Sequence, residues 1–431
     1  MKTENHFIKN FNQLATSQER KLALEIVETG FAALDTTRII ENNFNIKDNI
    51  LKIKCHAFDL TDFKNIYLIG LGKCACDAAL AIKTKLGKMI KAGVVIDIKS
   101  PSDYNNSAIK FFKGTHPKPS IENIKASEAI VKLSESITGD DLVLIIVSGG
   151  GSALLCSSEK EYEAGRKIYE TFLSVGGTID ELNTLRKHIS DLKGGGLAKR
   201  FFPATLVSLI FSDVPSGNVD QVASGPTFKD RTTLEDVNKI LEKYQLTDLK
   251  NKIEFFETPK DDQYFEKSYY ILMASNVEAL NAMRDKAIEF KLDPKIISAN
   301  ISDKVENVAR MFTEKLNNNA VLLGGGEVKV ALPADVQGKG GRNCHLTLEA
   351  AQYLQNGAVF ISVASDGMDN SEAAGAIADF STLKKISEQR LDYQKEKNNF
   401  NSFNVFKAIN DLIVTGPTGS NVADLMVALH I

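Results

Sequence analysis

Short apolar runs alternate with amphipathic stretches along most of the chain. Four runs have the length and the branched apolar residues of buried strands, at residues 66–70, 94–98, 142–147 and 205–211. Four stretches repeat apolar residues at helical spacing, at residues 22–34, 77–86, 124–133 and 165–175. This alternation predicts an α/β fold with a doubly wound, Rossmann-like parallel sheet.

A polar, charge-rich stretch at residues 232–262 divides the chain, and Pro259 lies near its end. The alternation then restarts, with strands expected at residues 269–273, 321–323, 359–363 and 412–414, and helices at residues 277–290, 305–316 and 346–354. We therefore expect two domains, an N-terminal Rossmann-like domain of residues 1–255 and a C-terminal α/β domain of residues 265–431.

Composition narrows the classes of function. The 431 residues are 43% apolar and 25% charged, which is typical of a globular protein large enough for two domains. The net charge of −3 is well mixed along the chain, so no nucleic-acid surface is expected. No apolar window approaches the roughly 20 residues that span a bilayer, and we expect no membrane partner and a cytoplasmic location. Five cysteines without CxxC spacing argue against a disulfide framework and a zinc site.

Three triple-glycine motifs are the strongest chemical signal. They are Gly149, Gly150 and Gly151 between Ser148 and Ser152; Gly194, Gly195 and Gly196; and Gly324, Gly325 and Gly326 before Glu327. Glycine has no Cβ and accepts positive φ, so such turns can present backbone N–H groups to a phosphate. One motif alone also closes ordinary turns, but three in one chain, two of them after predicted strands, indicate a phosphate or nucleotide site.

Other polar residues follow predicted strands, where parallel sheets bind ligands. Lys73 ends the motif Gly-Leu-Gly-Lys, which is too short for a P-loop; it is either a surface residue or a phosphate contact. Asp213, Asp366 and the turn that contains Thr418 also follow apolar runs. The nucleophile elbow GxSxG is absent, so a hydrolase triad has little support.

With these motifs the chain resembles the class II glycerate 2-kinases. The resemblance covers nearly the whole sequence in order, at residues 70–73, 116–117, 148–154, 182–198, 212–214, 223–227, 325–327, 340–343, 365–367, 373–376 and 415–424. It implies phosphoryl transfer from Mg²⁺·ATP to the 2-hydroxyl of D-glycerate. The reaction would take place in a cleft between the Rossmann-like domain and a smaller C-terminal α/β domain. D-glycerate and ATP are the implied small-molecule partners, in a monomer or homodimer.

The resemblance also implies roles for individual residues. Lys73 would neutralise phosphate charge, and Arg342 would hold a carboxylate or the transferred group with its planar fork. Asp213 and Asp366 would bind the metal and accept the hydroxyl proton, with the division between them left open. The acceptor would contact Arg342, Asn343, Lys73 and Arg186. The nucleotide phosphates would contact the residues Ser148, Gly149, Gly150, Gly151, Ser152, Gly194, Gly195, Gly196, Gly325, Gly326, Glu327 and Thr418.

Several of these residues have structural alternatives. Asp366 with the following glycine could form a β-turn, and Glu327 could pair with Lys329 or Arg342. Arg186 and Lys193 could belong to a solvated basic face. The chain also departs from the family pattern at Cys344-His345, Ser365 and Asn370, which leaves the acceptor hydroxy acid open.

Two other classes of function remain possible. A hydroxypyruvate reductase would need the dinucleotide fingerprint GxGxxG, but the third glycine is missing after Gly72. A non-catalytic sugar-phosphate-binding protein would keep the glycine motifs without needing Lys73, Arg342 and both aspartates.

Overall fold

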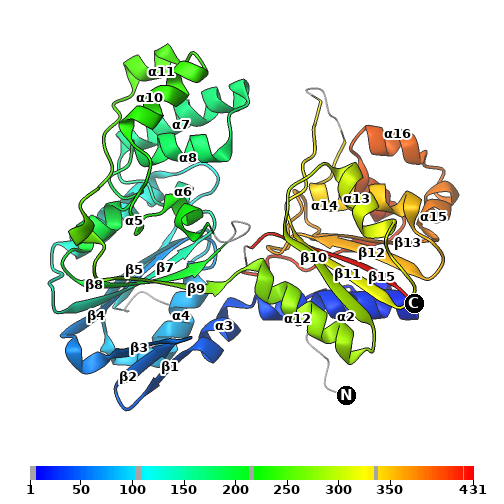
Figure 1. The fold of residues 1–431 in the computed structure, drawn as a ribbon, viewed down its shortest axis with the longest axis horizontal. Helices are drawn as coiled ribbons and strands as arrows, with labels where there is room; N and C mark the ends of the chain where they lie inside the picture. Colours follow the sequence, from blue (N-terminus) through cyan, green and yellow to red (C-terminus); the bar gives the residue numbers. More distant parts are fainter. Residues whose placement is uncertain (1–5, 102–107, 213–217, 334–337, 421) are drawn as a thin grey trace. The chain divides into compact units, whose positions relative to one another are not determined.

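The computed structural model describes residues 6–101, 108–212, 218–333, 338–420 and 422–431, which form two compact units (Figure 1). The parallel-sheet unit comprises residues 39–212 and 218–273. The mixed-sheet unit combines residues 6–38 with the described residues from 274 to 431. The units thus differ from a division into residues 1–255 and 265–431, because the first helices pack against the sheet formed late in the chain.

The parallel-sheet unit contains the expected Rossmann-like sheet. Its strands are β4 (Asn65–Leu71), β5 (Ile90–Asp97), β6 (Ile109–Lys113), β7 (Asp141–Ser148), β8 (Thr205–Phe211) and β9 (Ser268–Ala274). They lie in the order β6-β5-β4-β7-β8-β9, which is the Rossmann order, and β4 pairs in parallel with both β5 and β7. The order of the strands reverses between β4 and β7, where such sheets bind ligands beyond the strand ends.

Helices cover both faces of this sheet. Helices α4 (Ala75–Leu86) and α5 (Ile121–Ser134) lie on opposite sides of it (Figure 1). A separate group of helices packs around its own apolar cluster, formed by α7 (Glu159–Val175), α8 (Ile179–Lys187), α10 (Leu234–Lys243) and α11 (Thr247–Lys252). The remaining elements are α3 (Thr36–Asn43), α6 (Gly151–Leu154), α9 (Gly196–Phe201) and an antiparallel sheet of β1 (Phe44–Lys47), β2 (Ile50–Ile53) and β3 (His56–Asp59).

The mixed-sheet unit has its last strand at the centre. Its strands are β10 (Asp293–Ile301), β11 (Ala320–Gly326), β12 (Ala358–Val363), β13 (Gly375–Asp379), β14 (Leu412–Ile413) and β15 (Asp424–His430). They lie in the order β10-β11-β15-β12-β13-β14, and β15 runs antiparallel to both β11 and β12. The carboxyl ends of β11 and β12 therefore meet the start of β15 at one edge of the sheet.

Side chains alternate between the two faces of the mixed sheet. Leu323, Ile361 and Val427 pack under α2 (Gln18–Ala33) and α12 (Asn276–Glu289). Phe360 and Met426 face the opposite layer, which contains α13 (Val305–Thr313), α14 (Arg342–Ala350), α15 (Thr382–Glu388), α16 (Tyr393–Asn398) and α17 (Ser402–Ala408). The short helix α1 (Phe11–Leu14) precedes α2. Across the described ranges, no helix is both long and apolar enough to cross a bilayer.

A buried arginine fastens α2 to the far strands of the mixed sheet. Arg20 is fully buried and donates hydrogen bonds to Asp379 at the end of β13 (3.0 Å) and to Asp411 just before β14 (2.5 Å). Lys385 also donates to Asp411, at 3.1 Å. This charge network, together with the apolar face of α2, explains why the first segment belongs to the mixed-sheet unit.

We predict that Arg20→Ala lowers the free energy of unfolding of the mixed-sheet unit by about 3 kcal/mol, because two carboxylates lose a buried counter-charge. Urea unfolding followed by circular dichroism measures the loss. Lys21→Ala is the matched control. The Lys21 side chain is exposed, and its ion pair with Glu25 spans 3.9 Å, so this substitution should lower the free energy of unfolding by less than about 0.5 kcal/mol. An equal effect of the two substitutions would contradict the anchoring role of Arg20.

Candidate functional site

The turns after β4 and β7 are interlocked at the point where the strand order reverses. The backbone N–H of Lys73 donates to the carbonyl of Gly149 at 3.0 Å, and the Ser148 hydroxyl donates to the carbonyl of Leu71 at 3.2 Å. A Cβ at Gly150 would lie 3.1 Å from Cγ of Lys73. The structure therefore brings Lys73 together with the motif from Ser148 to Ser152, two groups that are 75 or more positions apart in the sequence.

This close approach depends on glycine. Gly72 has φ +119°, and a Cβ there would lie 2.1 Å from the Ser148 hydroxyl oxygen. Gly150 has φ +81°, in the left-handed region. Any other residue at Gly72 would push the two turns apart and move Lys73 away from the glycine motif.

Backbone donors in the turn after β4 are already used inside the protein. The N–H groups of Gly72 and Ala75 donate to the carbonyls of Ile96 (3.2 Å) and Gly72 (3.2 Å). The N–H of Cys76, in the first turn of α4, donates to the Asp97 carboxylate at 3.0 Å. Asp97 ends β5, is fully buried, and burial raises its pKa to about 6. A carboxylate thus occupies the helix start that would bind a dinucleotide pyrophosphate.

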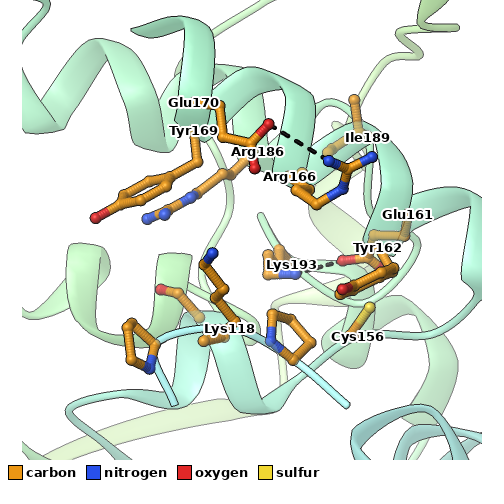
Figure 2. Close-up of a pocket in the computed structure, with 15 residues that line it drawn as sticks. Lys118, Cys156, Glu161, Tyr162, Arg166, Tyr169, Glu170, Arg186, Ile189 and Lys193 are labelled. Carbon is orange, nitrogen blue, oxygen red and sulfur yellow. Dashed lines mark hydrogen bonds and ion pairs between the residues drawn. The ribbon is translucent and has the colours of Figure 1, made fainter. Parts of the chain in front are cut away.

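Beyond Ser152 lies a cavity within the parallel-sheet unit (Figure 2). The Ser152 hydroxyl shares a 2.8 Å hydrogen bond with the Ser224 hydroxyl. Arg186, on α8, also lines the cavity, and its guanidinium carbon lies 5.6 Å from the centroid of the Tyr169 ring. Lys193 lies at the base and pairs with Glu161, and both side chains are buried. Lys193 is therefore not part of a solvated basic face.

The second glycine motif packs against a neighbouring turn. The N–H groups of Gly194 and Gly195 donate to the carbonyls of Ser224 and Gly225, both at 2.9 Å, and Gly196 donates to Lys193 at 3.0 Å. These donors are occupied, so this motif closes a turn before α9.

In the mixed-sheet unit, Arg342 is held by two carboxylates. It begins α14 and donates from Nε and Nη2 to both oxygens of Asp424, at 2.5 and 3.2 Å, and from Nη1 to Glu327 at 2.9 Å. Asp424 begins β15 directly opposite Gly326. Burial raises the pKa of Asp424 to about 7, while hydrogen bonds and attraction from Asp424 outweigh the burial of Arg342 and raise its pKa. Glu327 thus pairs with Arg342, which is the structural alternative to a phosphate contact.

The expected ligand residue Asn343 is buried, and its contacts are internal. Its side-chain oxygen accepts from Ser362 at 2.5 Å, and its amide nitrogen donates to Asp369 at 3.2 Å. The Asp369 carboxylate also accepts from the N–H groups of Asn343 (3.0 Å) and Cys344 (2.8 Å), at the start of α14. Asp369 and Asn343 thus position the helix that presents Arg342.

The neighbouring departures from the family pattern are interior residues. Cys344 is fully buried, and His345 stacks on Phe400 with ring centroids 4.8 Å apart. Burial raises the pKa of the Cys344 thiol and lowers the pKa of His345. These side chains belong to the packing of α14 within its own unit.

Asp366 and Thr418 lie together just beyond β12. The N–H of Thr418 donates to the carbonyl of Asp366 at 3.2 Å, and its hydroxyl donates to the carbonyl of Ser365 at 2.5 Å. One Asp366 carboxylate oxygen accepts from the N–H of Met368 at 3.0 Å, as in the β-turn alternative. Val363, the end of β12, pairs with Leu425, so this cluster shares the sheet edge with Asp424.

The third glycine motif is not a turn. Gly325 and Gly326 are the last residues of β11 and pair with Leu425 and Asp424 of β15. Asp213 lies outside the described residues. Within the described ranges, no group of three His, Cys, Asp or Glu side chains could hold a metal ion.

Sequence reasoning missed Asp97, Asp369 and Asp424 as determinants of these sites. Asp424 was visible only as the last residue of the motif at 415–424, and Asp369 only as a second acidic residue after Asp366. Asp97 lies near the end of the strand predicted at residues 94–98, a position that is often functional in Rossmann sheets.

Comparisons with known proteins cover both units. One family model, a domain of unknown function (DUF4147), matches residues 22–256, and the MOFRL family matches residues 320–424. A D-glycerate 2-kinase from Thermotoga maritima is 33% identical, over 95% of this chain and 98% of the relative. A protein from Agrobacterium vitis named as a hydroxypyruvate reductase is 33% identical, over 84% of this chain and 86% of the relative. The crystal structure of a T. maritima glycerate kinase superposes with a TM-score of 0.81 at 30% identity, over 95% of this chain and 99% of that one.

We predict that Asp97→Asn removes a pH dependence of stability. An unfolded Asp titrates near pH 3.9, so between about pH 4 and 6 the folded state keeps a proton that the unfolded chain has released. Wild-type stability therefore falls as the pH rises through this window, by about 3 kcal/mol in total. Relative to wild type, the variant should gain that amount between pH 4 and 7.

Urea unfolding at pH 4, 5.5 and 7 gives the two free energies. Asp77→Asn, which neutralises a carboxylate in the first turn of α4, is the control for removing a nearby charge. A difference between Asp97→Asn and wild type that stays constant with pH would contradict the raised pKa of Asp97.

Proposed function

The chain belongs to the glycerate kinase family, and from that premise we propose that it transfers a phosphoryl group from ATP to the 2-hydroxyl of D-glycerate. The products are 2-phosphoglycerate and ADP. The structural observation that supports this most is the contact between Lys73 and the glycine motif at Gly149 and Gly150. It sets a cation beside a turn without Cβ atoms, at the point of the sheet where ligands bind.

Phosphoryl transfer requires little covalent chemistry from a protein and much electrostatic positioning. The glycerate hydroxyl oxygen attacks the γ-phosphorus, the bond to the ADP oxygen breaks, and the hydroxyl proton is taken up by a base. Lys73 stabilises the charge that develops on the transferred group. Ser148 and Ser152 flank the turn along which the phosphates lie.

The mixed-sheet unit supplies a second, pre-positioned cation. Asp424 holds Arg342 from the buried side, with a side-chain exposure of 3% for Asp424 against 51% for Glu327. We infer that Glu327 yields to a phosphate or carboxylate while Asp424 keeps the guanidinium in place. Asn343 acts through the position of α14 rather than by touching substrate.

Magnesium arrives with ATP as part of the substrate. Mg²⁺ takes most of its ligands from phosphates and water and needs only one or two carboxylates from a protein. Asp366 and Asp213 would hold it, and one of them would accept the hydroxyl proton.

The hydroxypyruvate reductase alternative is supported by the name of one relative but not by the geometry. A nicotinamide dinucleotide needs the backbone donors at the start of α4, and the Asp97 carboxylate occupies the N–H of Cys76 there.

Two assays on the wild type separate the functions. With D-glycerate, ATP and Mg²⁺, we expect release of ADP that stops when excess EDTA is added and resumes with Mg²⁺ or Mn²⁺. With hydroxypyruvate and NADH or NADPH, we expect no oxidation of the cofactor. Reductase turnover without ADP release would overturn the proposal, and the absence of both activities would favour a non-catalytic binding protein.

We predict that Lys73→Ala lowers kcat by about 100- to 1,000-fold, because a cation is lost where transition-state charge develops. The melting temperature should stay unchanged, since the backbone N–H of residue 73 still bonds to Gly149. Lys91→Ala, an exposed lysine at the start of β5, is the control and should retain full activity. A kcat within threefold of wild type in Lys73→Ala would remove Lys73 from the mechanism.

A further inference from the structure

Two cations, Arg186 and Lys118, line the cavity beyond Ser152. The cavity, of about 70 Å³, lies between α7, α8 and the loop that leads into α5. Figure 2 shows the guanidinium of Arg186 reaching down from α8 beside the Tyr169 ring, and the amine of Lys118 reaching up from the loop towards it. Like charges placed this way repel each other, and an anion between them would relieve the repulsion.

Arg186 differs from Arg166 and Lys193, which also line the cavity. Arg166 pairs with Glu163 and Glu170, and Lys193 pairs with Glu161. Within the described ranges Arg186 has no ion pair, and the Tyr169 ring is the partner of its guanidinium.

Burial of the Arg186 guanidinium without a counter-charge is unfavourable in free energy. It lowers the pKa of Arg186, although arginine remains charged at any physiological pH. The carboxylates at the cavity, Glu161 and Glu170, are each committed to another cation. The charge that is missing next to Arg186 is therefore one that a ligand can supply.

The cavity continues the site proposed above. Ser152 and Ala153 line it and directly follow the glycine turn that contacts Lys73. The hydroxyls of Ser152 and Ser224 form a hydrogen-bonded pair that can also bond to a ligand hydroxyl. An anion held by Arg186 and Lys118 would thus have its other end directed to the phosphate turn.

The size of the cavity indicates which ligand it takes. The enclosed space of about 70 Å³ has room for the carboxylate end of a small hydroxy acid. The planar fork of an arginine matches the two oxygens of a carboxylate.

We propose that Arg186 and Lys118 bind the carboxylate of the acceptor, a three-carbon hydroxy acid, and that this cavity sets acceptor specificity. The proposal rests on the kinase function and assigns its acceptor to the parallel-sheet unit. Arg186 forms the bidentate contact, Lys118 adds a second positive charge, and the Tyr169 ring contacts the guanidinium.

The test compares Arg186→Gln, Arg186→Lys and Lys118→Gln with Arg166→Gln, a matched control that lines the same cavity but already has carboxylate partners. Loss of a charge-assisted bidentate contact should raise the KM for D-glycerate at least 20-fold in Arg186→Gln and about fivefold in Lys118→Gln. Arg186→Lys should recover only part of the loss, because lysine has no fork. The KM for ATP should change less than twofold in every variant.

A second readout separates recognition from a structural role. Wild type should prefer D-glycerate over its neutral amide, D-glyceramide, in kcat/KM, and this preference should shrink at least tenfold in Arg186→Gln. A general loss of structure would lower both values together and leave their ratio unchanged. An unchanged ratio, or a KM for ATP that rises while the KM for D-glycerate does not, would overturn the proposal, and the latter result would assign the cavity to the nucleotide.

Calorimetric titration with sodium D-glycerate alone tests the carboxylate site at Arg186 separately from the kinase function. Binding to wild type that Arg186→Gln weakens at least 20-fold supports the carboxylate site, even if no phosphoryl transfer is detected and the kinase function fails. Absence of D-glycerate binding to wild type, or equal binding to Arg186→Gln, would overturn the carboxylate site whatever the kinase assay shows.

Discussion

The contact between the ends of β4 and β7 is the constraint on which the rest of the parallel-sheet unit's chemistry depends. The Ser148 hydroxyl reaches the carbonyl of Leu71, the N–H of Lys73 reaches the carbonyl of Gly149, and Gly72 leaves no room for a Cβ between them. These bonds consume backbone groups that a dinucleotide-binding sheet of the same strand order would offer to its cofactor. A ligand at this position is therefore contacted mainly by side chains, and cationic side chains stabilise the charge that develops during phosphoryl transfer.

A comparable constraint organises the mixed-sheet unit. Because β15 lies between β11 and β12, its first residue, Asp424, arrives at the carboxyl ends of both strands. The buried Asp424 carboxylate then fixes the guanidinium of Arg342, and Asp369 fixes the start of the helix that carries it. Each unit thus presents a cation from a fixed element: Lys73 extends from a turn held by backbone hydrogen bonds, and Arg342 is held through its guanidinium.

The sequence predicted those parts of the fold whose signal is local. The strands β4, β5, β7 and β8 were predicted because strands buried on both faces of a parallel sheet read as continuous apolar runs. Strand β15 was missed because residues 424–430 contain leucine, methionine and alanine, which favour helices, and only one β-branched residue. Strand β10 was missed because most of its residues are only partly buried. The triple glycine at Gly324–Gly326 was interpreted as a turn because glycine has low strand propensity, but pairing with β15 extends the strand through it.

The candidate site shows the same division. Lys73 and the motif from Ser148 to Ser152 were predicted together, since both follow neighbouring strands of a parallel sheet. The burial of Lys193 was not predictable, because its partner Glu161 lies 32 residues earlier in the chain, on helix α7. In the described part of the chain, Arg186 lacks an ion pair because the carboxylates of the cavity pair with other cations. The pair of Lys193 with Glu161 joins residues that are distant in the sequence, so no local sequence pattern predicts that Arg186 is left without a carboxylate.

The position of the new phosphate ester tests the central claim most directly. After incubation of the protein with D-glycerate and Mg²⁺·ATP, a proton-coupled ³¹P NMR spectrum identifies the carbon that carries the phosphate. Transfer to the 2-hydroxyl predicts a phosphomonoester doublet, because the phosphorus couples to the single proton on C2. A triplet from the two protons on C3, or no ester at all in the presence of folded protein, would contradict the account.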